Sequence, residues 1–271
     1  MFFLWVFALS IPFWGIGALT GGELLPGLPL AALMAVCPVT AALILVYRQH
    51  GRAGVTSLLR RAFEFGRIPA KIWLLPTLLI LPLISLLSFA LLRLTGTPVP
   101  NPQIALLPTL LLCGFFFIGA LGEELGWSGY AIDRMQARWG AFNASLILGV
   151  IWAVWHYIPL MQAGRSLNWI AWWTLGTVAA RVIIVWLYNH TGKSVLIAAL
   201  FHMTVNVTWQ LFPVSGSYFD PGINGLLSAL IVVVILIVWE PQTLAQRRIF
   251  RPTEQEPDAS APAPSRSHPD R

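Results

Sequence analysis

Long apolar stretches follow one another along most of this chain, and they constrain its fold more than any other feature. A helix needs roughly 20 predominantly apolar residues to cross a bilayer. Eight stretches approach that length, near residues 1–19, 30–47, 72–94, 105–122, 142–160, 168–188, 194–212 and 223–239. The chain is 57% hydrophobic and only 10% charged, whereas soluble domains carry about 25% charged residues. The sequence therefore predicts an all-α integral membrane protein, a bundle of about eight transmembrane helices, and excludes a soluble or disordered chain.

The placement of the basic residues predicts how this bundle is oriented. The net charge of +6 would suggest nucleic acid as a partner of a soluble chain. Here the basic residues cluster in alternate connecting segments, namely 48–71, 134–138, around Lys193 and 247–251, whereas the opposite segments contain Arg165. Cytoplasmic loops of membrane proteins carry the excess of Lys and Arg. We therefore expect a multi-pass protein of the plasma membrane with both termini in the cytoplasm, in contact with lipid and not with nucleic acid.

Composition divides the chain into two parts. Residues 1–240 form the predicted polytopic membrane domain, and the polar motifs described below occupy about 105–212. Residues 241–271 form a predicted disordered cytoplasmic tail, because residues 253–271 are rich in Pro, Ser, Ala and charge. The first apolar stretch has neither a basic leading segment nor a small-residue cleavage site, so it is interpreted as a retained span.

Ionisable side chains are rare inside the predicted spans, and such groups are costly in a membrane and commonly functional. They are Glu123, Glu124, His156, Arg181 and His202, with the amide of Asn206 one turn beyond the last. Each alone has an ordinary explanation, since a membrane histidine often bonds a neighbouring helix and a glutamate pair can mark a helix end. Taken together, they favour a polar intramembrane cavity.

Helix geometry predicts that some of these groups meet. The run 105–137 would form a helix roughly 50 Å long, which is longer than the roughly 30 Å hydrocarbon core. The two glutamates therefore fall inside one long helix and need not lie at the membrane edge. In an antiparallel hairpin with the next helix, Glu123 would lie level with His156, roughly 21 Å from the connecting turn. His202 and Asn206 are four residues apart and share one helix face.

These residue types are those of a hydrolytic site. A carboxylate beside an imidazole can deprotonate a water molecule and later protonate a leaving amine. A second imidazole and an amide can donate hydrogen bonds to the oxyanion of a tetrahedral intermediate. The same His and Glu groups are also able to hold Zn²⁺ with one open coordination position. Residue types alone do not separate the two mechanisms.

Three short motifs resemble those of the CPBP intramembrane proteases, relatives of the type II CAAX prenyl endopeptidases. The family's Glu-Glu-x-x-x-Arg pattern is followed by residues 123–128 except at the last position. An aromatic residue, three spacers and His are present at 152–156, and His-x-x-x-Asn at 202–206. The motifs occur in the family's order, each in its own apolar segment.

The resemblance implies an intramembrane endopeptidase whose cavity opens to the cytoplasm and whose substrate is a membrane-associated or lipid-modified peptide or protein. Carried over by position, Glu123 would activate water together with His156, while His202 and Asn206 would form the oxyanion site. Glu124 would be the supporting carboxylate. The family has been described both as zinc-dependent and as glutamic proteases, so the resemblance implies zinc in the first case and no cofactor in the second.

One position departs from the family pattern, because the motif arginine is Ser128 in this chain. A serine can bond Glu124 one turn away but cannot neutralise a carboxylate, and two adjacent carboxylates repel each other. We expect Arg181, an otherwise unexplained charge in the sixth span, to supply the missing guanidinium. The alternatives are that Arg181 extends toward the membrane interface and that the site is degenerate.

The sequence leaves competing functions open. A catalytically weak or inactive protein of the same fold would act as a binding or immunity factor, and Ser128 is the main argument for it. A transporter would use the buried Glu and His groups as a proton relay. Trp127, Trp152 and Trp155 are interpreted as packing residues.

Overall fold

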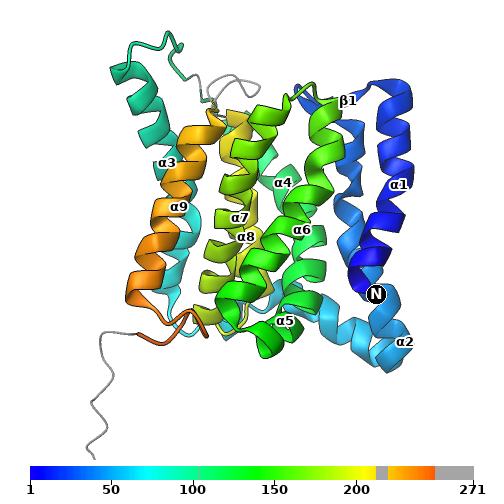
Figure 1. The fold of residues 1–271 in the computed structure, drawn as a ribbon. Helices are drawn as coiled ribbons and strands as arrows, with labels where there is room; N and C mark the ends of the chain where they lie inside the picture. Colours follow the sequence, from blue (N-terminus) through cyan, green and yellow to red (C-terminus); the bar gives the residue numbers. More distant parts are fainter. Residues whose placement is uncertain (103, 212–218, 248–271) are drawn as a thin grey trace, which may run out of the picture.

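The computed structural model describes residues 1–102, 104–211 and 219–247 of the chain, most of which lie in helices packed into a bundle (Figure 1). The α-helices are α1 (Phe2–Thr20), α2 (Cys37–Arg60), α3 (Leu74–Leu94), α4 (Leu106–Gly126), α5 (Ile132–Trp139), α6 (Ala141–Gln162), α7 (Leu167–His190), α8 (Val195–Leu211) and α9 (Pro221–Val238). A short antiparallel pair, β1 (Glu23–Leu25) and β2 (Leu28–Pro29), follows α1. Short helical turns are η1 (Leu30–Val36), η2 (Arg61–Phe63), η3 (Phe65–Arg67) and η4 (Lys71–Trp73), and a π-helical segment, η5, spans Trp127–Ala131.

The helices confirm the predicted all-α membrane bundle. Seven helical segments in the described residues are long and apolar enough to cross a membrane, the two longest being Leu30–Phe63 and Leu106–Trp139. The eighth predicted span corresponds to α8, which is apolar but has 17 residues. Every predicted span therefore has its helix.

The long helix that carries the glutamates is bipartite. Residues 106–139 are helical throughout, as predicted, but η5 interrupts the α-helical hydrogen bonding directly after α4. Gly140, with a φ of 74°, ends α5 and starts the turn into α6. α5 packs against α6, whereas α4 packs mainly against α2 and α8. The predicted hairpin is therefore confirmed near its turn by the packing of α5 on α6, whereas α4 has its main contacts with other helices. Single π turns of this kind are frequent at functional sites.

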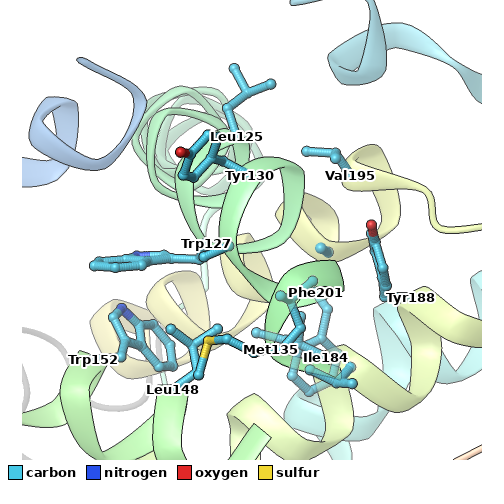
Figure 2. Packing of buried hydrophobic residues seen from close by; sticks show 14 of the residues in the cluster. Leu125, Trp127, Tyr130, Met135, Leu148, Trp152, Ile184, Tyr188, Val195 and Phe201 are labelled. Atoms are coloured by element: carbon cyan, nitrogen blue, oxygen red, sulfur yellow. The ribbon is translucent and has the colours of Figure 1, made fainter. Parts of the chain in front are cut away.

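Buried apolar side chains fill the bundle between η5, α6, α7 and α8. Figure 2 shows Trp127 and Trp152 at one side of this core, with Leu148, Ile184 and Phe201 beside them. All five side chains are almost entirely buried, or entirely so. This core anchors the segments that carry the polar motifs.

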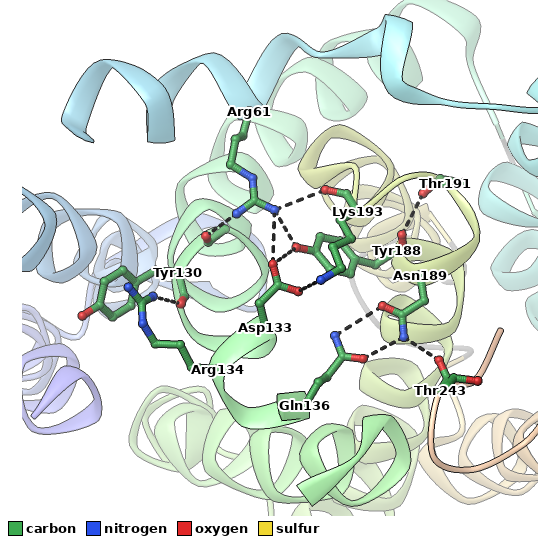
Figure 3. A network of polar contacts seen from close by, with 11 residues as sticks. Arg61, Tyr130, Asp133, Arg134, Gln136, Tyr188, Asn189, Thr191, Lys193 and Thr243 are labelled. Carbon is green, nitrogen blue, oxygen red and sulfur yellow. Dashed lines mark hydrogen bonds and ion pairs between the residues drawn. The ribbon is translucent and has the colours of Figure 1, made fainter. Parts of the chain in front are cut away.

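A polar network closes the end of the bundle at which the basic segments gather (Figure 3). Arg61 donates from Nη1 to the backbone oxygen of Gly129 in η5 at 2.6 Å and from Nη2 to the Tyr188 hydroxyl at 2.5 Å. Tyr188 donates to Asp133 at 3.0 Å, and Asp133 also pairs with Lys193 at 3.0 Å. The network thus joins the end of α2 to η5, α5, α7 and the α7–α8 turn.

The segment after α9 folds back on this same end. The backbone N–H groups of Ala141 and Phe142 donate to the carbonyl oxygens of Gln242 and Pro241 at 2.8 and 2.9 Å. These contacts satisfy N–H groups that the first turn of a helix otherwise leaves unpaired. The expectation of a disordered tail from residue 241 is therefore wrong for 241–247, and the remainder, 248–271, lies outside the described residues.

Candidate active site

Glu123 lies in the last turn of α4, and two tryptophans from other segments bond its side chain. Its Oε2 accepts hydrogen bonds from Trp127 Nε1 at 3.2 Å and from Trp152 Nε1 at 2.8 Å. Its Oε1 lies 3.9 Å from His202 Nε2, which is too far for a hydrogen bond. One carboxylate oxygen is thus fixed and the other lies near an imidazole. Interpreting Trp127 and Trp152 as packing residues alone was incomplete, since both indoles also orient this carboxylate.

Glu124 lies at the centre of a buried charged cluster. Its Oε2 accepts a hydrogen bond from Arg181 Nη1 at 2.9 Å and another from the Ser128 hydroxyl. Its Oε1 lies 3.0 Å from His202 Nδ1. The side chains of Arg181 and Glu124 are both 0% exposed. The expected pairing of Arg181 with Glu124 is confirmed, and extension of Arg181 toward the membrane interface is excluded.

His202 links the two glutamates. Because a carboxylate only accepts hydrogen bonds, the Nδ1–Glu124 contact assigns a proton to Nδ1 and directs Nε2 toward Glu123. Trp152 packs edge-on against the His202 ring, with centroids 4.9 Å apart, and its own ring lies 4.2 Å from the Arg181 guanidinium carbon. The Arg181 contact is a cation–π interaction. Trp152 therefore touches all the charged groups of the site except Glu124.

His156 lies one turn beyond Trp152 on α6. Its Nδ1 is 2.8 Å from the backbone oxygen of Trp152, and its ring packs between Trp155 and Trp173. A carbonyl oxygen only accepts, so Nδ1 carries the proton and Nε2 is left as an acceptor in the neutral ring. The residue of α6 that bonds Glu123 is Trp152, and His156, predicted to lie level with Glu123, lines the same cavity.

One cavity of about 360 Å³ brings the predicted residues together. Glu123, His156, His202 and Asn206 all line it, whereas Glu124 and Arg181 lie behind its wall. Most of the remaining lining is apolar, and it includes Leu28, Leu33, Phe115, Ile118, Trp173 and Phe219. The cavity is thus a polar site at the end of an apolar chamber.

The cavity extends toward the end of the bundle that carries β1 and β2, since its lining includes Leu24, Gly27, Leu28 and Pro29 (Figure 1). The resemblance implied an opening at the opposite, basic end. The opening toward the cytoplasm stays a prediction; at the basic end the Arg61 network joins η5 to α7. A separate surface groove beside Arg60 contains none of the predicted site residues.

The donor set does not fit a zinc site of the usual catalytic kind. Such a site takes three protein ligands at about 2.0–2.3 Å and leaves one position for water. Within the part of the chain that the structure describes, no three or more His, Cys, Asp or Glu side chains are grouped to hold a metal ion. Both oxygens of Glu124 are already bonded, to Arg181, Ser128 and His202. No step is therefore derived through a metal.

A carboxylate and two imidazoles thus line a cavity in a membrane bundle, and a second buried carboxylate lies behind them; groups of these kinds are suited to hydrolysis. Comparison with known proteins makes the assignment specific. Residues 104–208 match the family model described as type II CAAX prenyl endopeptidase Rce1-like. The chain is also 26% identical over 256 residues to CAAX prenyl protease 2 of Methanococcus maripaludis, an alignment that covers 86% of this chain and 92% of that protein. These two matches support a membrane protease similar to the CAAX prenyl proteases, and the seven candidate spans in the described residues support a multi-pass membrane protein.

Proposed function

We propose that this protease is an intramembrane endopeptidase in which Glu123 activates the attacking water. The observation that carries the proposal is the asymmetric environment of the Glu123 carboxylate. Two indole N–H groups hold Oε2, while Oε1 has no hydrogen bond among the described residues and lies 3.9 Å from His202 Nε2. A fixed carboxylate with one available oxygen at the wall of a cavity is suited to take a proton from water.

His156 supports the same step from the other helix. Its acceptor nitrogen, Nε2, belongs to a ring that lines the cavity together with Glu123. In the proposed reaction the water oxygen bonds to the scissile carbonyl carbon, and one water proton passes to Glu123. His156 Nε2 accepts a hydrogen bond from the same water and helps to orient it. The tetrahedral intermediate then collapses, the C–N bond breaks, and the proton is returned to the leaving amine.

His202 and Asn206 are proposed to bind the oxyanion. They lie one turn apart on α8, and both line the cavity. The Asn206 amide can donate to the oxyanion from Nδ2, and His202 can donate from Nε2 when both of its ring nitrogens carry a proton. Glu124 and Arg181 then act through His202, by holding its ring in place.

The apolar chamber beyond this site supports a membrane-associated or lipid-modified substrate. The archaeal relative is named a prenyl protease, and we propose a prenylated peptide or protein as the substrate of this chain as well. We also propose that both termini are cytoplasmic and that the membrane is the plasma membrane, on the distribution of basic residues. Accessibility of single cysteines at Arg60 and Glu23 to a membrane-impermeant reagent tests the orientation, because the two positions lie on opposite sides.

The decisive experiment measures hydrolysis by the full chain in lipid nanodiscs. The substrates are a quenched fluorescent peptide with an S-farnesyl cysteine and the same peptide without the lipid. General acid–base groups contribute about 10²–10⁴-fold, so Glu123→Gln and His156→Gln should lower kcat by factors in that range. Glu23→Gln changes an exposed carboxylate and serves as the matched control. Hydrolysis that persists in Glu123→Gln refutes the mechanism.

The binding or immunity factor remains the second candidate. The departure at Ser128 was its main support, and the Arg181–Glu124 pair supplies the guanidinium that Ser128 lacks. A folded chain that hydrolyses neither peptide, yet retains a farnesylated one, would favour this second function.

A further inference from the structure

We propose that a second polar patch in the cavity, formed by Thr177 of α7 with Asn224 and Ser228 of α9, binds backbone groups of the substrate peptide. The proposal rests on the proposed function, because it assigns a substrate contact to the same cavity. All three residues line that cavity and all are more than nine-tenths buried. α9 lies outside the 104–208 segment that matches the family model.

Close packing of α7 on α9 forms the patch. A Cβ atom built on Gly176 would lie 3.5 Å from the Cα of Gly225, so the two helix backbones are in van der Waals contact there. Thr177 and Asn224 are the sequence neighbours of these two glycines, and Ser228 lies one turn beyond Asn224. The glycines therefore bring side chains of both helices to one level of the cavity wall.

Asn224 presents an oriented acceptor. Its Nδ2 donates to the backbone oxygen of Asp220 at 3.0 Å and to the Ser88 hydroxyl at 3.2 Å. Because the Asp220 carbonyl only accepts, the amide cannot be reversed, and Oδ1 must face the other way. Among the described residues Oδ1 has no donor, although the side chain is only 7% exposed.

The two hydroxyls are also available. Buried Ser and Thr residues in helices commonly bond a carbonyl one turn back, as Thr174 and Thr208 do here at 2.7 and 2.6 Å. Thr177 is 7% exposed and Ser228 4% exposed, yet neither hydroxyl has a hydrogen-bond partner in the described part of the chain. Since both residues line the cavity, their hydroxyls are free to bond a ligand that enters it.

The chemistry of the patch selects the part of the substrate that it contacts. A peptide in extended conformation presents alternating N–H donors and C=O acceptors, which an amide oxygen and two hydroxyls can match. A prenyl or acyl chain offers neither group, and it is suited to the apolar lining. We therefore place the peptide backbone against α7 and α9, in the cavity that the hydrolytic residues also line.

Removal of the hydroxyls separates binding from stability. Thr177→Val and Ser228→Ala break no hydrogen bond within the described protein, so their melting temperatures should equal or exceed that of the parent. Each should raise KM for the hydrolysed peptide about three- to tenfold, the range expected for one lost hydrogen bond, with kcat little changed. Ser145→Ala is the matched control, since that buried hydroxyl bonds the backbone oxygen of Phe142 and does not line the cavity.

Ester analogues of the peptide identify the contact directly. Each amide near the scissile bond is replaced in turn by an ester, which removes one N–H donor. At one position the ester and a patch variant should each raise KM, and together no more than either alone, as expected for two ends of one hydrogen bond. Additive losses at every position, or an unchanged KM in both variants, overturn the proposal. Glu123→Gln is assayed in parallel, because its loss of kcat tests the hydrolytic mechanism independently of the patch.

Discussion

Arg181 is the only arginine or lysine of the described residues that forms an ion pair with Glu124, and replacement by methionine removes this cation. The guanidinium Nη1 lies 2.9 Å from Glu124 Oε2, and both side chains are fully buried. Removal of one partner of a buried ion pair costs about 3–5 kcal/mol, because the other charge is left unpaired. Loss of the cation–π contact with Trp152 adds about 0.5–2 kcal/mol.

Two features of the site move the expected value toward the lower part of this range. Arg181 Nε and Nη2 have no hydrogen-bond partner among the described residues, so their removal ends an existing cost. Ser128 and His202 also continue to bond Glu124 in the variant. We expect Arg181→Met to lose about 3 kcal/mol, and the double variant Glu124→Gln/Arg181→Met, which buries no charge from this pair, to recover most of it.

The free energy of unfolding is measured by titration with SDS in mixed micelles, for the parent, both single variants and the double variant. Arg134→Met is the matched control, since Arg134 stacks on Tyr130 as Arg181 does on Trp152, but it donates to a backbone oxygen and contacts no buried carboxylate. A loss below about 1 kcal/mol in Arg181→Met would refute the argument that this charge pair stabilises the site. A double variant no more stable than Arg181→Met would refute it as well.

Four further outcomes are expected in the same hydrolysis assay. Trp152→Phe removes the 2.8 Å bond to Glu123 and should lower kcat about tenfold or more, with KM little changed. Arg181→Met should also lower kcat, because Arg181 helps to hold Glu124. Ser128→Arg in that background returns a guanidinium to Glu124 and should restore part of kcat; no gain would contradict the idea that a guanidinium from position 128 can replace Arg181. Arg61→Ala should speed amide hydrogen exchange in η5 and lower kcat, whereas the exposed Arg60→Ala should do neither. Zinc chelators should leave the rate unchanged, and inhibition reversed by added zinc would contradict the metal-free mechanism.

The sequence could predict which polar residues form the site, because they lie inside apolar segments. Glu123, His156 and His202 stand out because charged or titratable groups are rare in spans, and the cavity does bring them together. Arg181 could be matched to Glu124 by the same logic, since a buried cation requires an anion and the motif lacked one at Ser128. Charge balance in an apolar environment is thus readable without coordinates.

The tryptophans could not be assigned in this way. An indole in a membrane helix packs against almost any apolar neighbour, so nothing in the sequence indicates which N–H meets a carboxylate. Trp127 bonds Glu123 from one turn further along the same chain segment, and Trp152 reaches it from α6. The regular helical hairpin predicted from the sequence placed His156, and not Trp152, level with Glu123.

The sequence by itself determined the membrane bundle, the polar motifs and the need for a cation beside the glutamates, because hydrophobic length and charge are properties of single segments. Only the tertiary structure decided which oxygen of Glu123 is available, toward which end the cavity extends, and that Thr177 and Asn224 share its wall. Those outcomes depend on the π turn in η5, on which helices α4 contacts and on the contact of Gly176 with Gly225. The contacts between helices arise from the packing of segments distant in the chain, which local patterns do not encode.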